Sequence, residues 1–227
     1  MKLGVTTTTA DAEGEVLETR AVGELSRERV LAVLESFIGD IEQIPPMHSA
    51  VKVKGQPLYK LAHQGIEIDR KPRRVRIHEI ELIRMEGDEV EIFVHCSKGT
   101  YIRTLAEDIG EALGCGAHLS GLRRTGAGPF REEEGAVTLE QVRTTAEQGL
   151  DALDELLLPM DTALADWPAV QLSDNAAYYI GQGQPVLVPQ APTSGWLRLV
   201  GADEHFFGVG NILDDGRVAP KRLLNLR

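Results

Sequence analysis

The chain has 227 residues, of which 42% are hydrophobic and 26% are charged, and its formal net charge is -11. This length can bury a core and hold two domains, and the composition is ordinary for a soluble globular protein. The sequence contains neither a bilayer-spanning apolar run of roughly 18 to 20 residues nor a signal-peptide-like start. Two cysteines without a secretory signal suit a reducing compartment. We therefore expect a cytoplasmic protein without a membrane partner.

The charge is distributed unevenly along the chain. Residues 1–45 hold 9 acids and 4 bases, and residues 132–227 hold 15 acids and 6 bases. Residues 46–84 reverse this balance, with 9 bases and 4 acids. Such a local excess can bind phosphate whatever the overall charge, because screening limits each charge to about 8–10 Å. A solvated basic loop would give the same pattern, so charge alone leaves both interpretations open.

The first fifth of the chain predicts short strands and one helix. Residues 1–22 are expected to form strands about a turn at 11–14. Ser26 is expected to cap a helix that ends at Gly39. The two prolines in 44–47 predict an extended loop.

The middle of the chain predicts a β-hairpin followed by a helix. A short strand at 51–53 leads through a turn at 54–56 into a short helix over 58–63, and Pro57 suits the first position of this helix. Residues 73–84 alternate between apolar and polar and are expected to pair with 89–96. A helix from Thr100 is expected to stop at Gly114. Its inward residues are predicted to be Leu105, Ile109 and Leu113.

The remaining residues predict a change of character after Pro159. A short strand is expected over 117–124 and helices from Thr138 and around 150–157. Short strands separated by Gly, Pro and Asp are then expected at 170–172, 185–188, 197–200 and 206–209. This spacing is typical of a small β-barrel or sandwich of about 60 residues. We therefore predict two domains, residues 1–165 and residues 166–227.

Three kinds of site are disfavoured by spacing. His95, Cys96, Cys115 and His118 match no zinc-finger spacing, and neighbours on a strand face opposite ways. The sequence holds no Gly-x-Ser-x-Gly elbow, no P-loop and no Gly-x-Gly-x-x-Gly after a strand. We expect neither a metal nor an organic cofactor.

The most informative stretch runs from His95 to Arg103. A strand leads into a Lys98-Gly99 turn, and a helix is expected to begin with Tyr101 and Arg103 in its first turn. An aromatic face and a guanidinium on a rigid element suit the binding of a flat base beside a negative charge. The alternative is a purely structural role, in which Tyr101 is a core aromatic and Arg103 pairs with a nearby acid. Residue types alone leave both open.

At these residues the chain resembles the bacterial tRNA pseudouridine-55 synthase family. The matching stretches follow the family's order along nearly the whole chain: 39–47, 49–52, 58–65, 96–103, 114–118, 122–124 and 216–220. The resemblance implies an enzyme that flips a T-loop uridine out of tRNA and isomerises it to pseudouridine without metal or organic cofactor. It also implies an α+β fold, with a mixed, largely antiparallel sheet and flanking helices, followed by a small PUA-like β-domain that touches RNA.

The resemblance also implies roles for individual residues. Tyr101 should contact the flipped base, Arg103 should pair with the catalytic aspartate, and Leu122 should line the pocket. The residues expected to bind substrate or its phosphates are Lys52, Arg73, Arg74, Arg76, Lys98 and Arg124. His48 departs from the tyrosine often found at its position, which leaves that contact unassigned.

The larger departure is the family's nucleophile, an aspartate within Gly-x-Leu-Asp-Pro-Leu-Ala-Thr-Gly. The 227 residues contain neither this segment nor the tyrosine expected on the next strand. The chain therefore resembles the C-terminal two-thirds of the enzyme, and we expect it to bind the T-arm of tRNA without turnover. We also expect an uncovered sheet edge near residues 1–5, which favours self-association or pairing with the missing N-terminal part. The alternatives are a non-catalytic RNA-binding module or RNA chaperone, and an α+β protein with no role in RNA.

Overall fold

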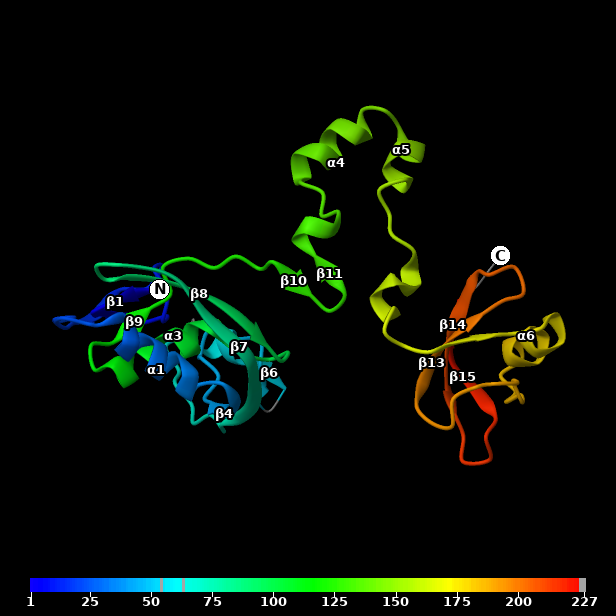
Figure 1. Ribbon diagram of the computed structural model, residues 1–227, viewed down its shortest axis with the longest axis horizontal. Helices are drawn as coiled ribbons and strands as arrows, with labels where there is room; N and C mark the ends of the chain where they lie inside the picture. The colour runs from blue at the N-terminus through cyan, green and yellow to red at the C-terminus, as the bar shows by residue number, and fades with distance from the viewer. Residues whose placement is uncertain (54, 63, 225–227) are drawn as a thin grey trace. The chain divides into compact units, whose positions relative to one another are not determined.

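A computed structural model describes residues 1–53, 55–62 and 64–224 (Figure 1). The chain divides into two compact units, Met1–Arg123 and Arg124–Arg227. Lys54 of the predicted turn and His63 at the predicted helix end lie outside the described residues. Within the described ranges, no helix combines the length and apolarity needed to cross a membrane.

The first unit is built on a five-stranded antiparallel sheet. Its strands, in spatial order, are β4 (Gly39–Gln43), β7 (Arg73–Glu86), β8 (Glu89–Cys96), β1 (Lys2–Leu3) and β9 (Ala117–His118). The long β7–β8 hairpin confirms the predicted pairing, since alternate residues of both strands turn toward the core. β1 pairs with a neighbour on each side, so the expected open edge is wrong for Lys2–Leu3. Residues 117–118 alone of the predicted strand 117–124 join the sheet.

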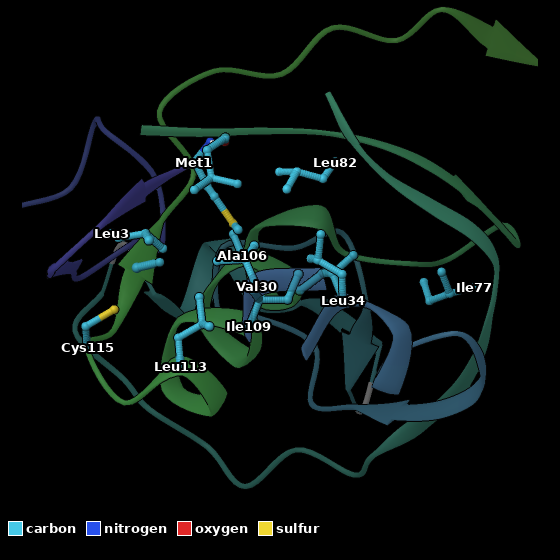
Figure 2. Close-up of a cluster of buried hydrophobic side chains, with 13 residues drawn as sticks. Met1, Leu3, Val30, Leu34, Ile77, Leu82, Ala106, Ile109, Leu113 and Cys115 are labelled. Atoms are coloured by element: carbon cyan, nitrogen blue, oxygen red, sulfur yellow. The ribbon is translucent and has the colours of Figure 1, made fainter. Parts of the chain in front are cut away.

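Helices α1 (Arg27–Ser36) and α3 (Ile102–Leu113) pack against the same core as the sheet. Figure 2 shows side chains of both helices meeting those of the strands. The buried side chains include Val30 and Leu34 from α1, Ala106, Ile109 and Leu113 from α3, and Ile77 and Leu82 from β7. Gly110 allows α3 to lie close to β9, because a Cβ at this position would stand 2.3 Å from the backbone nitrogen of Ala117. The predicted inward face of α3 is confirmed.

Local chemistry sets most of the helix ends. The Ser26 hydroxyl caps α1 by accepting the Arg29 N–H at 3.2 Å, as predicted. α1 ends at Ser36, earlier than predicted, because Gly39 already begins β4. α3 ends as predicted at Gly114, whose φ of 88° is the left-handed conformation that glycine adopts at low cost.

Two small hairpins complete the first unit. Strands β2 (Val5–Thr7) and β3 (Val16–Thr19) flank the predicted turn at 11–14. The tip of this hairpin is fixed by a bridge between Asp11 and Leu119. Strands β5 (Lys52–Val53) and β6 (Gln56–Pro57) precede α2 (Leu58–Ala62), so Pro57 ends a strand instead of beginning the helix.

The second unit contains a four-stranded sheet and short helices. The sheet order is β12 (Ala169–Gln171), β13 (Trp196–Val200), β14 (Phe206–Ile212) and β15 (Val218–Leu223), with β12 and β13 parallel. Helix α6 (Asp174–Gly181), which the sequence analysis does not predict, buries Ile180 in the core of this sheet. The predicted strand at 185–188 is reduced to one bridge, between Val186 and Val218. Pro185 begins this segment and Pro189 follows it, and proline has no N–H to donate to a ladder.

The part of the second unit before the sheet contains short helices, 3-10 turns and a small hairpin. It contains β10 (Gly126–Ala127), β11 (Phe130–Arg131), the 3-10 turns Glu132–Glu134 and Met160–Leu164, α4 (Leu139–Ala146) and α5 (Leu150–Asp154). Thr138 begins α4 through a capping box with Gln141, which confirms the predicted start. The predicted domain boundary at 165/166 falls between the second of these turns and β12, inside the second unit, and stays a prediction.

Candidate active site

The turn between β8 and α3 carries the stretch that the sequence singles out. The Ser97 hydroxyl accepts the Arg76 N–H at 2.9 Å, and the Thr100 hydroxyl donates to the Ser97 carbonyl at 2.8 Å. Lys98 is exposed in this turn. α3 begins at Ile102, so Tyr101 is the N-cap residue and the predicted start at Thr100 is wrong. Tyr101 is half-buried and extended, with φ -98° and ψ 106°.

The backbone of Tyr101 is held by a side chain that sequence reasoning missed. The Tyr101 N–H donates to Gln43 Oε1 at 3.0 Å, and Gln43 Nε2 donates to the Tyr101 carbonyl at 3.2 Å. Gln43 ends β4 and is only 1% exposed. A polar residue closing a short strand gave no signal of this contact, because its partner lies 58 residues away.

Arg103 is anchored by the tip of the β2–β3 hairpin and by the loop after β4. Its Nη1 donates to Asp11 Oδ2 at 2.9 Å and lies 3.5 Å from the Thr9 carbonyl oxygen. Its Nη2 donates to the His48 carbonyl at 2.8 Å. Arg103 therefore pairs with an acid of this chain, as the structural alternative predicts. The sequence predicts only a turn at Asp11, since no local pattern relates this residue to one 92 positions away.

Asp11 is held in its charged form. Partial burial raises the pKa of this carboxyl. The hydrogen bonds from the Thr9 hydroxyl and the Glu13 N–H, together with the bond and charge of Arg103, outweigh burial and hold the pKa of Asp11 below its usual range. The contact is thus an ion pair at neutral pH.

The anchoring leaves Arg103 able to take another acceptor. A guanidinium has more N–H donors than the described bonds to Asp11, Thr9 and His48 use. The side chain also stays 27% exposed. Arg103 can therefore hold a second carboxylate through a charge-assisted bond.

A cavity of about 380 Å³ lies between the β2–β3 tip, the loop after β4 and α3. Thr9, His48, Glu107 and Asp108 are among its lining residues. Burial raises the pKa of both carboxyls, and for Glu107 the neighbouring charges of Asp108 and Glu111 add to this effect. This wall is acidic, so it does not suit a phosphate.

The basic run after this loop divides between two roles. Arg70 lines the same cavity and donates to the Pro45 carbonyl at 3.1 Å, so it supports the loop. Arg73 lies opposite Gln43 in the sheet register, and the Arg76 carbonyl accepts the Ser97 N–H at 2.8 Å. The start of β7 therefore lies beside Gln43 and the turn that precedes Tyr101.

The arginines at this end of β7 are exposed but not isolated. Arg74 is 3.6 Å from Glu42, and Arg76 is 3.6 Å from Asp40. Exposed pairs of this length contribute about 0–1 kcal/mol. Phosphates can therefore compete for both arginines.

The other predicted site residues are less closely tied to Tyr101. Leu122 is 65% exposed, three residues after the Asp11–Leu119 bridge that fixes the hairpin tip. Lys52 is exposed on β5, and none of the described contacts joins it to Tyr101. Arg124 is exposed and belongs to the second unit. Across the described residues, no group of three or more His, Cys, Asp or Glu is arranged to hold a metal ion.

Three family models match successive parts of the chain. They are TruB family pseudouridylate synthase (N terminal domain) over residues 1–102, tRNA pseudouridylate synthase B C-terminal domain over 103–165, and Pseudouridine synthase II TruB, C-terminal over 168–224. The chain is 56% identical over 223 residues to tRNA pseudouridine synthase B of Nitrosococcus oceani, covering 98% of this chain and 72% of that protein. It is 54% identical to tRNA pseudouridine synthase B of Stutzerimonas stutzeri, covering 99% of this chain and 73% of that protein.

Solved structures show the same fold. A Cbf5-Nop10-Gar1 complex matches with a TM-score of 0.69 and 25% identity, over 90% of this chain and 64% of that chain. An H/ACA RNP bound to a substrate RNA containing 2'-deoxyuridine matches with a TM-score of 0.69 and 22% identity, over 92% of this chain and 64% of that chain. The chain thus spans less than two thirds of these structures' chains. The likeness confirms the predicted α+β class, a largely antiparallel sheet with flanking helices and a C-terminal β domain.

Proposed function

This chain belongs to the TruB family of pseudouridylate synthases, and from that premise we propose that it takes part in converting a T-loop uridine of tRNA to pseudouridine. One observation carries the proposal. Two residues after Tyr101, Arg103 is fixed by the ionised Asp11 and retains donors for a further carboxylate. Such a group is what a covalent mechanism with an aspartate nucleophile requires.

The proposed reaction is an isomerisation within one nucleotide. The bond between N1 and C1' of uridine breaks, a bond between C5 and C1' forms, the C5 proton leaves, and N1 gains a proton. In our proposal Tyr101 contacts the flipped base, and Arg103 keeps the nucleophilic carboxylate ionised and in place. Leu122 lines the base pocket.

Phosphate binding falls to exposed basic residues of the first unit. We propose that Arg73, Arg74, Arg76 and Lys98 meet the RNA backbone near Tyr101, and that Lys52 extends this contact. Arg124, which belongs to the second unit, is proposed to bind an RNA phosphate separately. Support comes from the sheet register, which brings the start of β7 beside Gln43. Since the overall net charge is -11, the local excess of bases is what attracts RNA.

We further propose that the nucleophile is supplied by residues outside this sequence. The 227 residues contain no Gly-x-Leu-Asp-Pro-Leu-Ala-Thr-Gly segment. Asp11 is a poor substitute, because Thr9, Glu13 and Arg103 already occupy its oxygens. The chain by itself is then expected to bind the T-arm without turning it over.

Tritium release tests the proposal directly. A tRNA carrying tritium at C5 of its uridines loses the label when the C5 proton leaves. We expect no release with the chain alone, and release when a polypeptide containing the aspartate segment is added. Arg103→Ala should abolish the restored release. Arg84→Ala should not, because Arg84 is an exposed arginine paired with Glu86 and Glu91 at the other end of β7.

Two results would count against the proposal in different ways. Release by the chain alone would show that the nucleophile lies within the 227 residues. The absence of both T-arm binding and restored release would overturn the role in tRNA modification.

A non-catalytic RNA-binding module is the second candidate, favoured by the exposed arginines of β7. It predicts that the chain binds the T-arm and that the affinity falls as salt is added. The logarithm of the association constant should fall with the logarithm of the salt concentration, with a slope of about 0.7 to 0.9 per neutralised phosphate. It also predicts that no added segment restores release. A salt-independent profile would exclude both RNA functions.

A further inference from the structure

We propose that Gln43 is a positioning residue of the active site, which sets where α3 begins and thereby orients Tyr101 and Arg103. The importance of Gln43 for RNA recognition rests on the proposed function. The effect of Gln43 on the conformation of Tyr101 is independent of that function.

Gln43 clamps the backbone of Tyr101 through two hydrogen bonds. The side chain is buried to 1% exposure, and its amide both donates to and accepts from the backbone of Tyr101. Burial of an amide is costly unless both of its polar groups find partners. Here a single residue satisfies both, so the clamp is specific for one backbone conformation of Tyr101.

Local preference alone would begin the helix earlier. Threonine is a good N-cap, whereas tyrosine has no side chain suited to capping. Thr100 nevertheless directs its hydroxyl to Ser97, and Tyr101 forms no side-chain cap bond. With Thr100 as the cap, Tyr101 would become the first helical residue and lose its extended φ and ψ. Gln43 selects the later start by binding the extended form.

The later start decides how the functional side chains point. Tyr101 stays outside the helix, and Arg103 becomes the second helical residue, from which it reaches Asp11 and the His48 carbonyl. Gln43 also stands at the beginning of the loop that carries His48. One side chain therefore couples β4, this loop and the start of α3. Its loss should let Tyr101 and Arg103 move relative to each other.

Hydrogen exchange of the 227-residue chain tests the positioning itself. Gln43→Met keeps the volume and removes both hydrogen bonds. We expect the Tyr101 amide to lose protection by about tenfold or more, because its only described acceptor is Gln43. The amide of Leu105, which donates to the Tyr101 carbonyl at 3.0 Å, and the amide of Ile109 should stay protected. Unchanged protection at Tyr101 would overturn the inference.

Base recognition tests the consequence. Binding is measured for a T-arm hairpin with uridine at the target position and for the same hairpin with an abasic target. We expect Gln43→Met to reduce the preference for uridine by about fivefold or more, as for a lost stacking contact, and to leave abasic binding within about twofold. Gln141→Met is the matched control in the second unit, where the Thr138 N–H donates to Gln141 Oε1 at 2.7 Å. This variant should change the affinity for neither hairpin.

Gln43→Glu provides a second variant with a pH signature. A neutral carboxyl can replace both amide contacts, whereas a carboxylate would oppose the Tyr101 carbonyl. The variant should resemble the original chain near pH 5 and Gln43→Met near pH 8, since burial raises a carboxyl pKa above its usual value of about 4.3. This comparison decides the matter if Gln43→Met does not fold.

The two possible failures can be told apart. If the unmodified chain binds neither hairpin, the proposed function fails, and hydrogen exchange still judges the positioning of Tyr101. If Gln43→Met loses protection at Tyr101 but keeps the full preference for uridine, the conformational clamp exists without the role in recognition, and the inference is overturned.

Discussion

The Asp11–Arg103 ion pair should give the first unit a pH-dependent part of its stability. Asp11→Asn keeps the side-chain shape and an acceptor for the Glu13 N–H, but removes the charge that faces Arg103. A hydrogen bond to a charged group contributes about 1.5–3 kcal/mol. Arg103 keeps its other acceptors, and the two side chains are 27% and 21% exposed, which places the loss at the lower end, about 1.5 kcal/mol. For a unit of residues 1–123, this lowers Tm by about 5–7 °C.

The sign of the pH dependence follows from the lowered pKa of Asp11. A carboxyl with a lower pKa in the folded state contributes stability that is present above its unfolded value, here 3.8. That stability is lost as the pH falls through the folded-state pKa. The difference in stability between the original chain and Asp11→Asn should therefore be constant from about pH 7 to pH 5. It should become smaller below about pH 4.

Calorimetry of the whole chain, combined with tryptophan fluorescence, measures this difference. Trp167 and Trp196 both lie in the second unit, so fluorescence identifies that unit's transition. Asp161→Asn is the matched control, because Asp161 binds Arg198 at the same 2.9 Å with similar exposure. Asp161→Asn should lower the Tm of the second unit, which fluorescence reports. Asp11→Asn should lower the Tm of the first unit, which only calorimetry detects. A shift at pH 7 below about 1 °C, or a difference that widens below about pH 4, would refute the reasoning.

Three further predictions concern other parts of the first unit. Gly110→Ala should destabilise it by about 3 kcal/mol or more in urea unfolding, because the new Cβ would meet the Ala117 nitrogen at 2.3 Å; a loss below about 1 kcal/mol would contradict this packing. Gly114→Ala should cost only about 1–2 kcal/mol, since its Cβ meets nothing within 4 Å and only the φ of 88° is strained. Arg74→Ala and Arg76→Ala should each change the free energy of unfolding by less than about 0.5 kcal/mol. Each should also reduce the salt dependence of T-arm binding by about one charge, and an unchanged salt slope would show that the arginine does not contact RNA phosphate.

Most of the fold of the first unit could be predicted because its signals are local. The alternation of residues 73–84 and 89–96, the inward face of α3 and its stop at Gly114 all follow from periodicity and turn chemistry within a few residues. The second unit was predicted less completely. α6 and β15 were missed, and Val186 forms only a bridge, because periodicity over so few residues does not distinguish a helix from a strand.

The candidate site divides in the same way. The sequence by itself determined that Tyr101 and Arg103 stand together after a tight turn, with a basic run elsewhere in the same half of the chain, and through the resemblance it indicated the family. Only the tertiary structure decided that Asp11 pairs with Arg103, that Gln43 hydrogen-bonds the backbone of Tyr101, and that β1 is covered on both sides. These contacts join residues that are distant in the chain, and periodicity describes which face a residue takes without specifying its partner. The backbone conformation of Tyr101 and the ionised partner of Arg103 are therefore properties of the assembled unit.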